Sequence, residues 1–220
     1  MKIGALVSSG KDSIYALSLV KNVTCLITII SENQDSYMFH SPNLSEIQAK
    51  ALDLPIIIQK TKGEKEKELL DLKKALIKAK EKFKIDGIVS GALFSEYQKK
   101  RIEKICKELN LKSFTPLWHI DQKKVMRDIL NSGFKFIIIK IAADGLDESW
   151  LGKEITHEDI DKLVELNKKL SINIAFEGGE AETLMISGPI FKKKLKIIKA
   201  KKEMENSYTG VYNIKKVELI

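Results

Sequence analysis

The alternation of apolar and polar positions predicts strands and helices that follow one another through the first half of the chain. Short β-branched runs predict strands, and the amphipathic segments between them predict helices. The expected strands are Lys2–Val7, Thr24–Ile30, Leu54–Gln59, Gly87–Ser90 and Ser113–Phe114, and the expected helices are Asp12–Lys21, Asn43–Leu52, Glu64–Phe83 and Glu96–Leu109. This alternation is typical of a parallel sheet covered by helices, with ligands bound at the carboxyl ends of the strands.

The pattern changes after Pro116. The expected elements are now helices Gln122–Asn131 (ending at Gly133) and Glu158–Leu170 (with Thr156 as N-cap), and strands Phe134–Ile141, Glu182–Ser187, Lys194–Lys199 and Val211–Val217. The last three strands have no helix between them. We therefore expect an α/β chain: a Rossmann-like, parallel-sheet nucleotide-binding domain at residues 1–119 and a smaller α+β domain at residues 120–220.

Composition excludes several classes of protein. With 44% hydrophobic and 31% charged residues among 220, the chain is not intrinsically disordered. No apolar run approaches the roughly 18 residues of a membrane helix, so we expect a cytoplasmic protein with no membrane partner. The net charge of +8 weakly favours a polyanionic partner such as a nucleotide or RNA. Cys25 and Cys106, without a CxxC pair, favour buried thiols over a zinc site or sulfur transfer.

The loop after the first expected strand, Val7–Ser13, is the most informative stretch. A buried strand runs into Ser-Ser-Gly, and a helix begins at once. Unpaired N–H groups at that helix start form an anion site, to which Ser8, Ser9, Ser13 and Lys11 add donors and charge. A phosphate chain is the natural ligand. An ordinary capped strand–helix turn is the alternative, because Ser and Asp are good caps.

This loop is not a Walker P-loop, because the required first glycine falls on Ala5 and Lys11 is followed by Asp12. It resembles instead the Ser-Gly-Gly-x-Asp-Ser loop of the N-type ATP pyrophosphatases, with Ser9 in place of the first glycine. The resemblance implies an enzyme that splits ATP between its α and β phosphates, adenylates an acceptor oxygen and releases pyrophosphate. It also implies ATP and Mg²⁺ as cofactors, with Asp12 as the metal ligand.

Four further blocks resemble the diphthine–ammonia ligase family over nearly the whole chain. The blocks are residues 37–43 (YMFHSPN), 91–98 (GALFSEYQ) followed by Arg101, 145–152 (GLDESWLG) and 177–183 (EGGEAET). Two positions depart from the family pattern: Ala181 replaces a usual aromatic, and His119 replaces a frequent glycine. The resemblance implies that the carboxylate of diphthine on elongation factor 2 is adenylated, and that ammonium displaces AMP to give the diphthamide amide. It leaves a homodimer open, and we do not expect nucleic acid as a partner.

The site residues expected on this basis fall into three groups. The catalytic residues are Lys11, Asp12, Ser13, Glu177 and Glu180. The nucleotide-binding residues are Ser8, Ser9, Gly10, Lys11, Asp12, Ser13, Ser31, His40, Gly91, Ser95, Glu96, Gln98 and Arg101. The substrate-binding residues are Asp147, Glu148, Trp150, Gly178, Gly179, Glu180, Glu182 and Thr183.

Each group has a plainer structural alternative. Glu96 could be a helix cap, and Arg101 could lie on a solvated helix face instead of reaching phosphate. The carboxylates of Glu177, Glu180 and Glu182 repel one another unless a cation is near, which favours Mg²⁺, ammonium or the trimethylammonium of diphthine. An aromatic face binds such a cation well, but Trp150 could equally be a core or lid residue.

Two other functions compete with this assignment. The same loop occurs in ligases that adenylate a tRNA base, and the basic charge would suit them. A nucleotide sensor without catalysis is the second, but a sensor would not need the acidic segment Glu177–Glu182.

Overall fold

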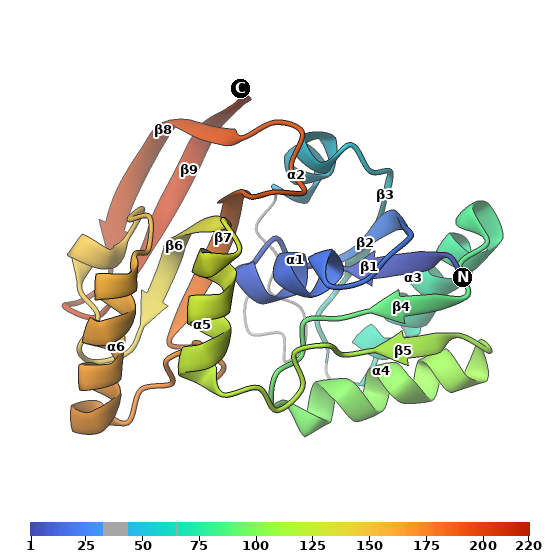
Figure 1. Cartoon of the computed structure of the whole chain (residues 1–220), viewed down its shortest axis with the longest axis horizontal. Helices are drawn as coiled ribbons and strands as arrows, with labels where there is room; N and C mark the ends of the chain where they lie inside the picture. The colour runs from blue at the N-terminus through green and yellow to red at the C-terminus, as the bar shows by residue number, and fades with distance from the viewer. Residues whose placement is uncertain (33–43, 65) are drawn as a thin grey trace. The chain divides into compact units, whose positions relative to one another are not determined.

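The computed structural model describes residues 1–32, 44–64 and 66–220 (Figure 1). The chain forms two compact units, Met1–Trp118 and His119–Ile220. In the described residues no helix combines the length and apolar character needed to cross a membrane.

The first unit is a five-stranded parallel sheet with helices, which confirms the expected α/β class. Its strands are β1 (Ile3–Leu6), β2 (Val23–Ser31), β3 (Ile56–Thr61), β4 (Gly87–Val89) and β5 (Lys112–Phe114), and its helices are α1 (Lys11–Ser18), α2 (Ser45–Leu52), α3 (Glu68–Phe83) and α4 (Glu96–Glu108). The strand order is β3-β2-β1-β4-β5. The chain thus builds outward from β1 in one direction and then crosses to β4 on the other side, so the order reverses between β1 and β4. Ligands bind at such a reversal in open α/β sheets.

A layer of apolar side chains from α3 and α4 covers one face of this sheet. Leu72 and Leu76 of α3 and Ile102 of α4 pack with residues of β2, β3 and β4. Cys25 and Cys106 lie in the same cluster and are buried, as the sequence predicted. Both thiols therefore contribute to the packing of this core.

The four helices described in the first unit are shorter than the sequence predicted, α4 by the single residue Leu109. Helix α1 ends at Ser18, whose hydroxyl donates to the carbonyl of Tyr15, and the chain then turns through Asn22 at φ 61°. Helix α3 begins at Glu68 instead of Glu64. Helix α2 begins at Ser45, and the expected start at Asn43 lies outside the described residues. Apolar periodicity marks the buried face of a helix well but its ends poorly.

The second unit is a four-stranded antiparallel sheet with two α-helices, as the smaller expected domain required. Its elements are α5 (Gln122–Asn131), β6 (Lys135–Ala142), the 3₁₀ turn η1 (Glu148–Trp150), α6 (His157–Leu170), β7 (Ala181–Ser187), β8 (Leu195–Met204) and β9 (Thr209–Leu219). The strand order is β7-β6-β9-β8. Thr156 is the N-cap of α6 and forms a capping box with Asp159, which confirms the predicted cap.

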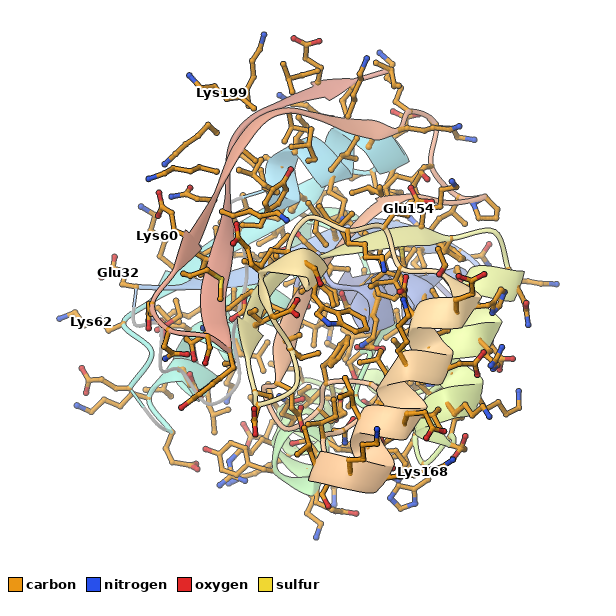
Figure 2. The ribbon with its side chains drawn as sticks, turned by 90° about the vertical axis from the view of Figure 1, so that its left-hand side faces the viewer. Glu32, Lys60, Lys62, Glu154, Lys168 and Lys199 are labelled. Atoms are coloured by element: carbon orange, nitrogen blue, oxygen red, sulfur yellow. The ribbon has the colours of Figure 1, made fainter. Side chains whose placement is uncertain are left out.

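Strand β8 extends five residues beyond the expected end at Lys199. Pairing with β9 continues to Met204, which lies opposite Gly210. The lysines of this longer strand are accommodated because β8 is at the edge of the sheet in the described part of the chain, and Lys199 extends away from the ribbon in Figure 2.

Candidate active site

Two loops meet at the carboxyl ends of β1 and β4, where the strand order reverses. A Cβ atom on Gly91, just after β4, would lie 2.6 Å from the backbone carbonyl carbon of Asp12 and 2.6 Å from the backbone nitrogen of Ser13. The loop after β4 therefore packs directly on the backbone of the first turn of α1. This contact explains the glycine at position 91 by close approach, independently of any ligand.

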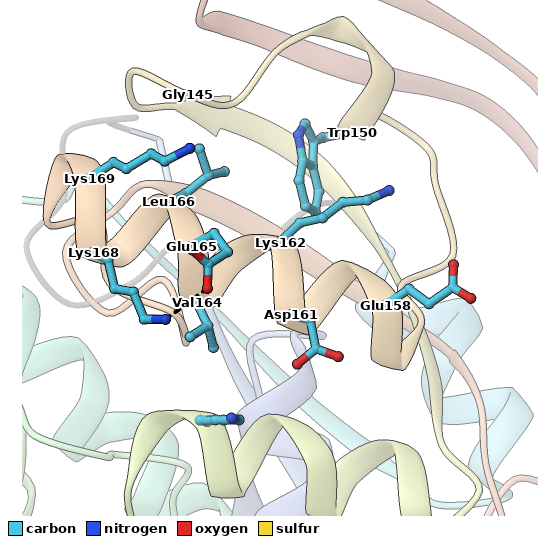
Figure 3. Close-up of a pocket in the computed structure, with 11 residues that line it drawn as sticks. Gly145, Trp150, Glu158, Asp161, Lys162, Val164, Glu165, Leu166, Lys168 and Lys169 are labelled. Atoms are coloured by element: carbon cyan, nitrogen blue, oxygen red, sulfur yellow. Dashed lines mark hydrogen bonds and ion pairs between the residues drawn. The ribbon is translucent and has the colours of Figure 1, made fainter.

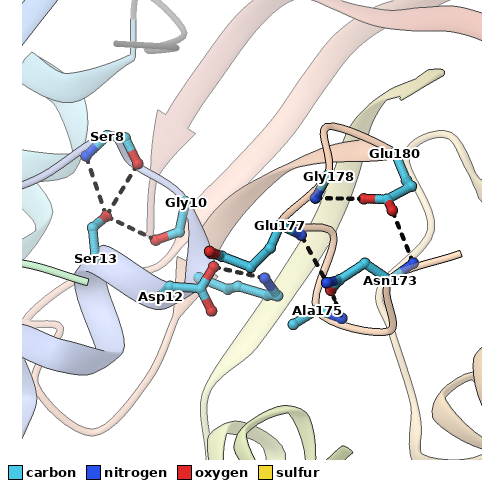
Figure 4. A network of polar contacts seen from close by, with 10 residues as sticks. Ser8, Gly10, Asp12, Ser13, Asn173, Ala175, Glu177, Gly178 and Glu180 are labelled. Carbon is cyan, nitrogen blue, oxygen red and sulfur yellow. Dashed lines mark hydrogen bonds and ion pairs between the residues drawn. The ribbon is translucent and has the colours of Figure 1, made fainter. Parts of the chain in front are cut away.

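The loop after β1 is closed by its own hydroxyl groups (Figure 4). The backbone N–H of Ser8 donates to Oγ of Ser13 at 3.2 Å, and that hydroxyl donates to the carbonyl of Gly10 at 3.1 Å. Helix α1 has Gly10 as its N-cap and no side-chain cap. The alternative of an ordinary side-chain-capped turn is therefore wrong, and the first-turn N–H groups retain the capacity to bind an anion.

Lys11 and Asp12 supply charge at this helix start. The side chain of Lys11 is only 2% exposed, and its Nζ lies 2.7 Å from Oδ2 of Asp12. The other oxygen, Oδ1 of Asp12, is buried and has no hydrogen-bond partner among the described residues. A buried carboxylate oxygen without a donor suits a cation, so Asp12 fits the metal-ligand role that the sequence suggested.

The two positions where glycine was expected both have left-handed backbone. Ser9 has φ 67° and His119 has φ 59°. Ser9 is also fully buried, and its hydroxyl has no hydrogen-bond partner in the described structure. Both positions thus have the left-handed backbone conformation that glycine adopts readily, although each has a side chain.

Ser95 and Arg101, at the N-cap and within α4, have protein partners that sequence reasoning did not foresee. Ser95, not Glu96, caps the helix by accepting the N–H of Gln98 at 3.3 Å. Arg101 is half-buried and paired within the protein: its Nε donates to Oε1 of Glu66 at 2.8 Å, and its guanidinium lies 3.4 Å from the ring centroid of Tyr97. Phosphate binding by Arg101 would compete with these contacts.

The remaining nucleotide-binding candidates are Ser31 and His40. Ser31 ends β2 and pairs in register with Thr61 of β3, which places it at the ligand-binding edge of the sheet. His40 lies outside the described residues.

In the second unit, the segment between α6 and β7 forms a turn closed by two side chains (Figure 4). Oδ1 of Asn173 accepts the N–H groups of Ala175 at 2.9 Å and Glu177 at 3.2 Å. The carboxylate of Glu180 accepts the N–H groups of Asn173 at 2.8 Å and Gly178 at 2.9 Å. Asn173 and Glu180 thus hold the backbone that carries Glu177.

These contacts change how the acidic cluster is interpreted. Glu180 is bonded to backbone, and Glu182 pairs with Lys140 at 3.1 Å. Part of the compensation that the sequence assigned to an external cation therefore comes from the protein itself. In the same segment, Gly179 has φ 88° with open space around it, and Thr183 is buried on β7.

The three substrate-binding candidates Asp147, Glu148 and Trp150 have different surroundings. Asp147 caps η1 by accepting the N–H of Ser149 at 2.9 Å. Hydrogen bonds from the hydroxyl of Ser149 and then from this N–H hold the pKa of Asp147 below its usual range. Glu148 is exposed, and its carbonyl accepts from Lys202. Trp150 is 7% exposed, and the ammonium of Lys153 lies 5.6 Å from its ring centroid. The ring therefore already contacts a cation of the protein.

Trp150 also borders a pocket of about 740 Å³ along α6 (Figure 3). Its lining is Lys123, Gly145, Trp150, Glu158, Asp161, Lys162, Val164, Glu165, Leu166, Lys168 and Lys169. The mixture of both charge signs gives this pocket no clear preference for a cation or an anion.

Sequence reasoning missed two organising residues, Asn173 and Gln48. Asn173 bonds to the N–H two residues ahead, which is an Asx turn that its position between a helix and a strand could have indicated. Gln48 lies on α2 and donates to the carbonyl of Ser9. No sequence pattern near either residue predicts this contact.

The strand order, the hydroxyl-closed loop and the uncapped α1 together define a nucleotide-binding α/β domain of the N-type ATP pyrophosphatase kind, joined to an antiparallel-sheet domain. The diphthamide synthase N-terminal domain model matches residues 1–113, and the C-terminal domain model matches residues 121–220. This chain belongs to the diphthamide synthase family.

Two curated diphthine–ammonia ligases agree with this assignment. The diphthine–ammonia ligase of Homo sapiens is 34% identical over 223 residues, covering 89% of this chain and 82% of that protein. The diphthine–ammonia ligase of Schizosaccharomyces pombe is 35% identical over 240 residues, covering 98% of this chain but 39% of the relative. A crystal structure of a predicted subunit of tRNA methyltransferase from Methanocaldococcus jannaschii aligns with TM-score 0.44 and 17% identity, over 88% of this chain and 100% of that one.

Proposed function

We propose that this chain is an ATP-dependent carbon–nitrogen ligase that converts diphthine to diphthamide with ammonium, releasing AMP and pyrophosphate. Its membership of the diphthamide synthase family supports the reaction. The observation that carries the ATP chemistry is the uncapped start of α1, closed by Ser8 and Ser13 at the reversal of strand order.

In the first unit, the loop Ser8–Ser13 binds the β and γ phosphates that leave as pyrophosphate. The N–H groups at the start of α1 and the ammonium of Lys11 stabilise the charge that develops on the leaving group. Ser31, Gly91 and Ser95, the N-cap of α4, lie at or just beyond strand ends of the same sheet and bind the rest of the nucleotide.

A magnesium ion would be held by Asp12, whose Oδ1 is buried without a donor. The described residues contain no group of three His, Cys, Asp or Glu side chains placed to hold a metal. This matches Mg²⁺, which is usually bound through one or two carboxylates together with substrate phosphates and water. When bound, the ion neutralises phosphate charge during transfer.

In the second unit, the turn 173–180 binds the acceptor, which we infer to be elongation factor 2 carrying diphthine. The diphthine carboxylate oxygen forms a bond to the α-phosphorus of ATP, and the bond to pyrophosphate breaks. The nitrogen of ammonia then bonds to the carbonyl carbon, AMP leaves with the carboxylate oxygen, and a proton is released. Glu177 is suited to bind a cationic substrate group at this turn.

A sulfur-transferring ligase is the alternative that the thiols argue against. Burial raises the pKa of the Cys25 thiol to about 11, and burial likewise raises the pKa of Cys106 to about 11. Neither thiol forms the thiolate that such chemistry needs near neutral pH.

The test is product analysis with purified chain, ATP, ammonium and diphthine-bearing elongation factor 2. We expect AMP, pyrophosphate and one amide per AMP, each dependent on all three substrates. A parallel reaction in which unmodified tRNA replaces the factor should form no AMP. Coupled release of ADP and phosphate, or AMP formation with tRNA alone, would contradict the proposal.

A further inference from the structure

Ser9 has a conformation that its own side chain disfavours. Its φ of 67° is left-handed, its side chain is fully buried, and its hydroxyl has no hydrogen-bond partner among the described residues. A non-glycine residue in this region is strained, and it persists only when surrounding structure holds it. Some contact outside the loop must therefore stabilise this backbone.

Gln48 supplies that contact from α2. Its side chain is fully buried, and its Nε2 donates to the carbonyl oxygen of Ser9 at 3.2 Å. The residues are 39 positions apart, so the bond ties the loop to a different element of the fold.

The geometry of one peptide unit connects this bond to anion binding. A trans peptide is planar, so the carbonyl of Ser9 and the N–H of Gly10 point in opposite directions. The next carbonyl, of Gly10, is likewise held, because it accepts from the N–H of Ile14 at 3.3 Å and from Oγ of Ser13 at 3.1 Å. With both carbonyl groups directed into the protein, the N–H groups of the loop face the other way.

We infer that Gln48 is a positioning residue that holds the pyrophosphate loop in its anion-binding form. The inference rests on the proposed function for the identity of the anion, and it makes Gln48 act through Ser9 and not by touching ATP. The role is needed in this chain because serine replaces the glycine that would adopt φ 67° without strain.

The main test compares Gln48→Met, which keeps side-chain length but loses the donor, with wild type. We expect pyrophosphate affinity and the single-turnover rate of AMP formation to fall on the order of tenfold, the value of one buried hydrogen bond. AMP affinity should be unchanged, because AMP lacks the phosphates that the loop binds. The matched control is Gln59→Met, since Gln59 lies on β3 and its exposed amide donates to the carbonyl of Lys60 and accepts from Nζ of Lys78, neither of which belongs to the loop.

A second variant keeps the inference falsifiable if Gln48→Met does not fold. In Gln48→Glu, a protonated carboxyl donates to Ser9 and an ionised one does not. Relative to wild type at each pH, its pyrophosphate affinity should therefore rise as pH falls from 8 to 5.5. Adding Ser9→Gly to Gln48→Met should recover about threefold of the lost affinity, because glycine needs no support at this φ.

Equal losses of AMP and pyrophosphate affinity in Gln48→Met would reduce Gln48 to a packing residue and overturn the inference. Wild-type pyrophosphate affinity in a folded Gln48→Met chain would overturn it as well. Failure of the wild type to form AMP would count against the proposed ligase reaction only, because direct pyrophosphate binding needs no turnover.

Discussion

The carboxylate of Glu180 accepts the backbone N–H of Asn173 at 2.8 Å, seven residues earlier in the chain. Its second oxygen accepts the N–H of Gly178 at 2.9 Å, so one side chain satisfies two backbone donors of the acidic turn. A residue that the sequence suggested as catalytic therefore also has a structural task.

The first prediction tests the structural role of Glu180. Glu180→Gln places an amide NH₂ against one of the two N–H groups, and we expect the free energy of unfolding to fall by about 1–3 kcal/mol. Glu182→Gln is the control, because its partly exposed pair with Lys140 should contribute less than about 1 kcal/mol. Urea unfolding measures the free energy of unfolding of wild type and of both variants. Equal losses would show that the Glu180 network does not stabilise the turn.

Gly91→Ala should impair ATP use more than folding. The added Cβ would meet the backbone of Asp12 and Ser13 at 2.6 Å, so the start of α1 has to move. We expect a destabilisation of about 1–3 kcal/mol and a loss on the order of a hundredfold in the single-turnover rate.

Gly4→Ala is the matched control for this close approach. Its Cβ would meet Cδ1 of Ile27 at 2.9 Å, the flexible end of a side chain away from the loop. This variant should lose stability but keep its turnover rate once folded. Similar rates in Gly91→Ala and Gly4→Ala would argue against a site at the meeting of the two loops.

The lowered pKa of Asp159 predicts that the free energy of unfolding depends on pH in the acidic range. Burial raises its pKa, but hydrogen bonds from Lys153 and Thr156 outweigh burial and hold the pKa below its usual range. A depressed pKa means that the stabilisation is complete above the unfolded value of about 3.9 and is lost as pH falls through the folded value. At pH 7, Asp159→Asn should lower the free energy of unfolding by about 1–3 kcal/mol.

The check is urea unfolding from pH 7 to pH 3. The difference between wild type and Asp159→Asn should be constant down to about pH 5 and shrink below it. Asp161→Asn, on the exposed side of the same helix, should show little change at any pH. A constant Asp159→Asn difference down to pH 3 would contradict the assignment.

Cysteine labelling should report unfolding and not activity. Since burial raises the pKa of both thiols to about 11, Cys25 and Cys106 should resist iodoacetamide at pH 8 in the native state. In 8 M urea both should label completely, as intact-mass measurement would show. Fast native labelling of either thiol would revive the sulfur-transfer alternative.

Sequence reasoning succeeded where chemistry is local. The step from a buried strand to Ser-Ser-Gly and a helix start located the loop Ser8–Ser13, and Thr156 was correctly predicted as an N-cap. Apolar periodicity likewise located α5 with its bounds at Gln122 and Asn131. These features depend on neighbours within a few positions, which a sequence displays directly.

It was less complete where partners are distant in the chain. Arg101 pairs with Glu66, 35 residues away, and Gln48 reaches Ser9 across 39 residues. The carboxylates of the acidic turn looked uncompensated because their partners, including Lys140 for Glu182, are brought close only by strand pairing. Charge counted along a segment does not show which charges the fold neutralises.

Strand β8 has a consequence for how copies of this chain meet one another. It is an edge of the antiparallel sheet in the described part of the chain, and Lys196, Lys199 and Lys201 are exposed along it. Lys199 already faces Lys216 across the β8–β9 pair. If the β8 strand of a second copy paired with this edge, its ammonium groups would lie beside those of the first copy. The pairing would cost both charge repulsion and desolvation. The lysines therefore disfavour fibre growth by strand addition along the exposed edge of β8.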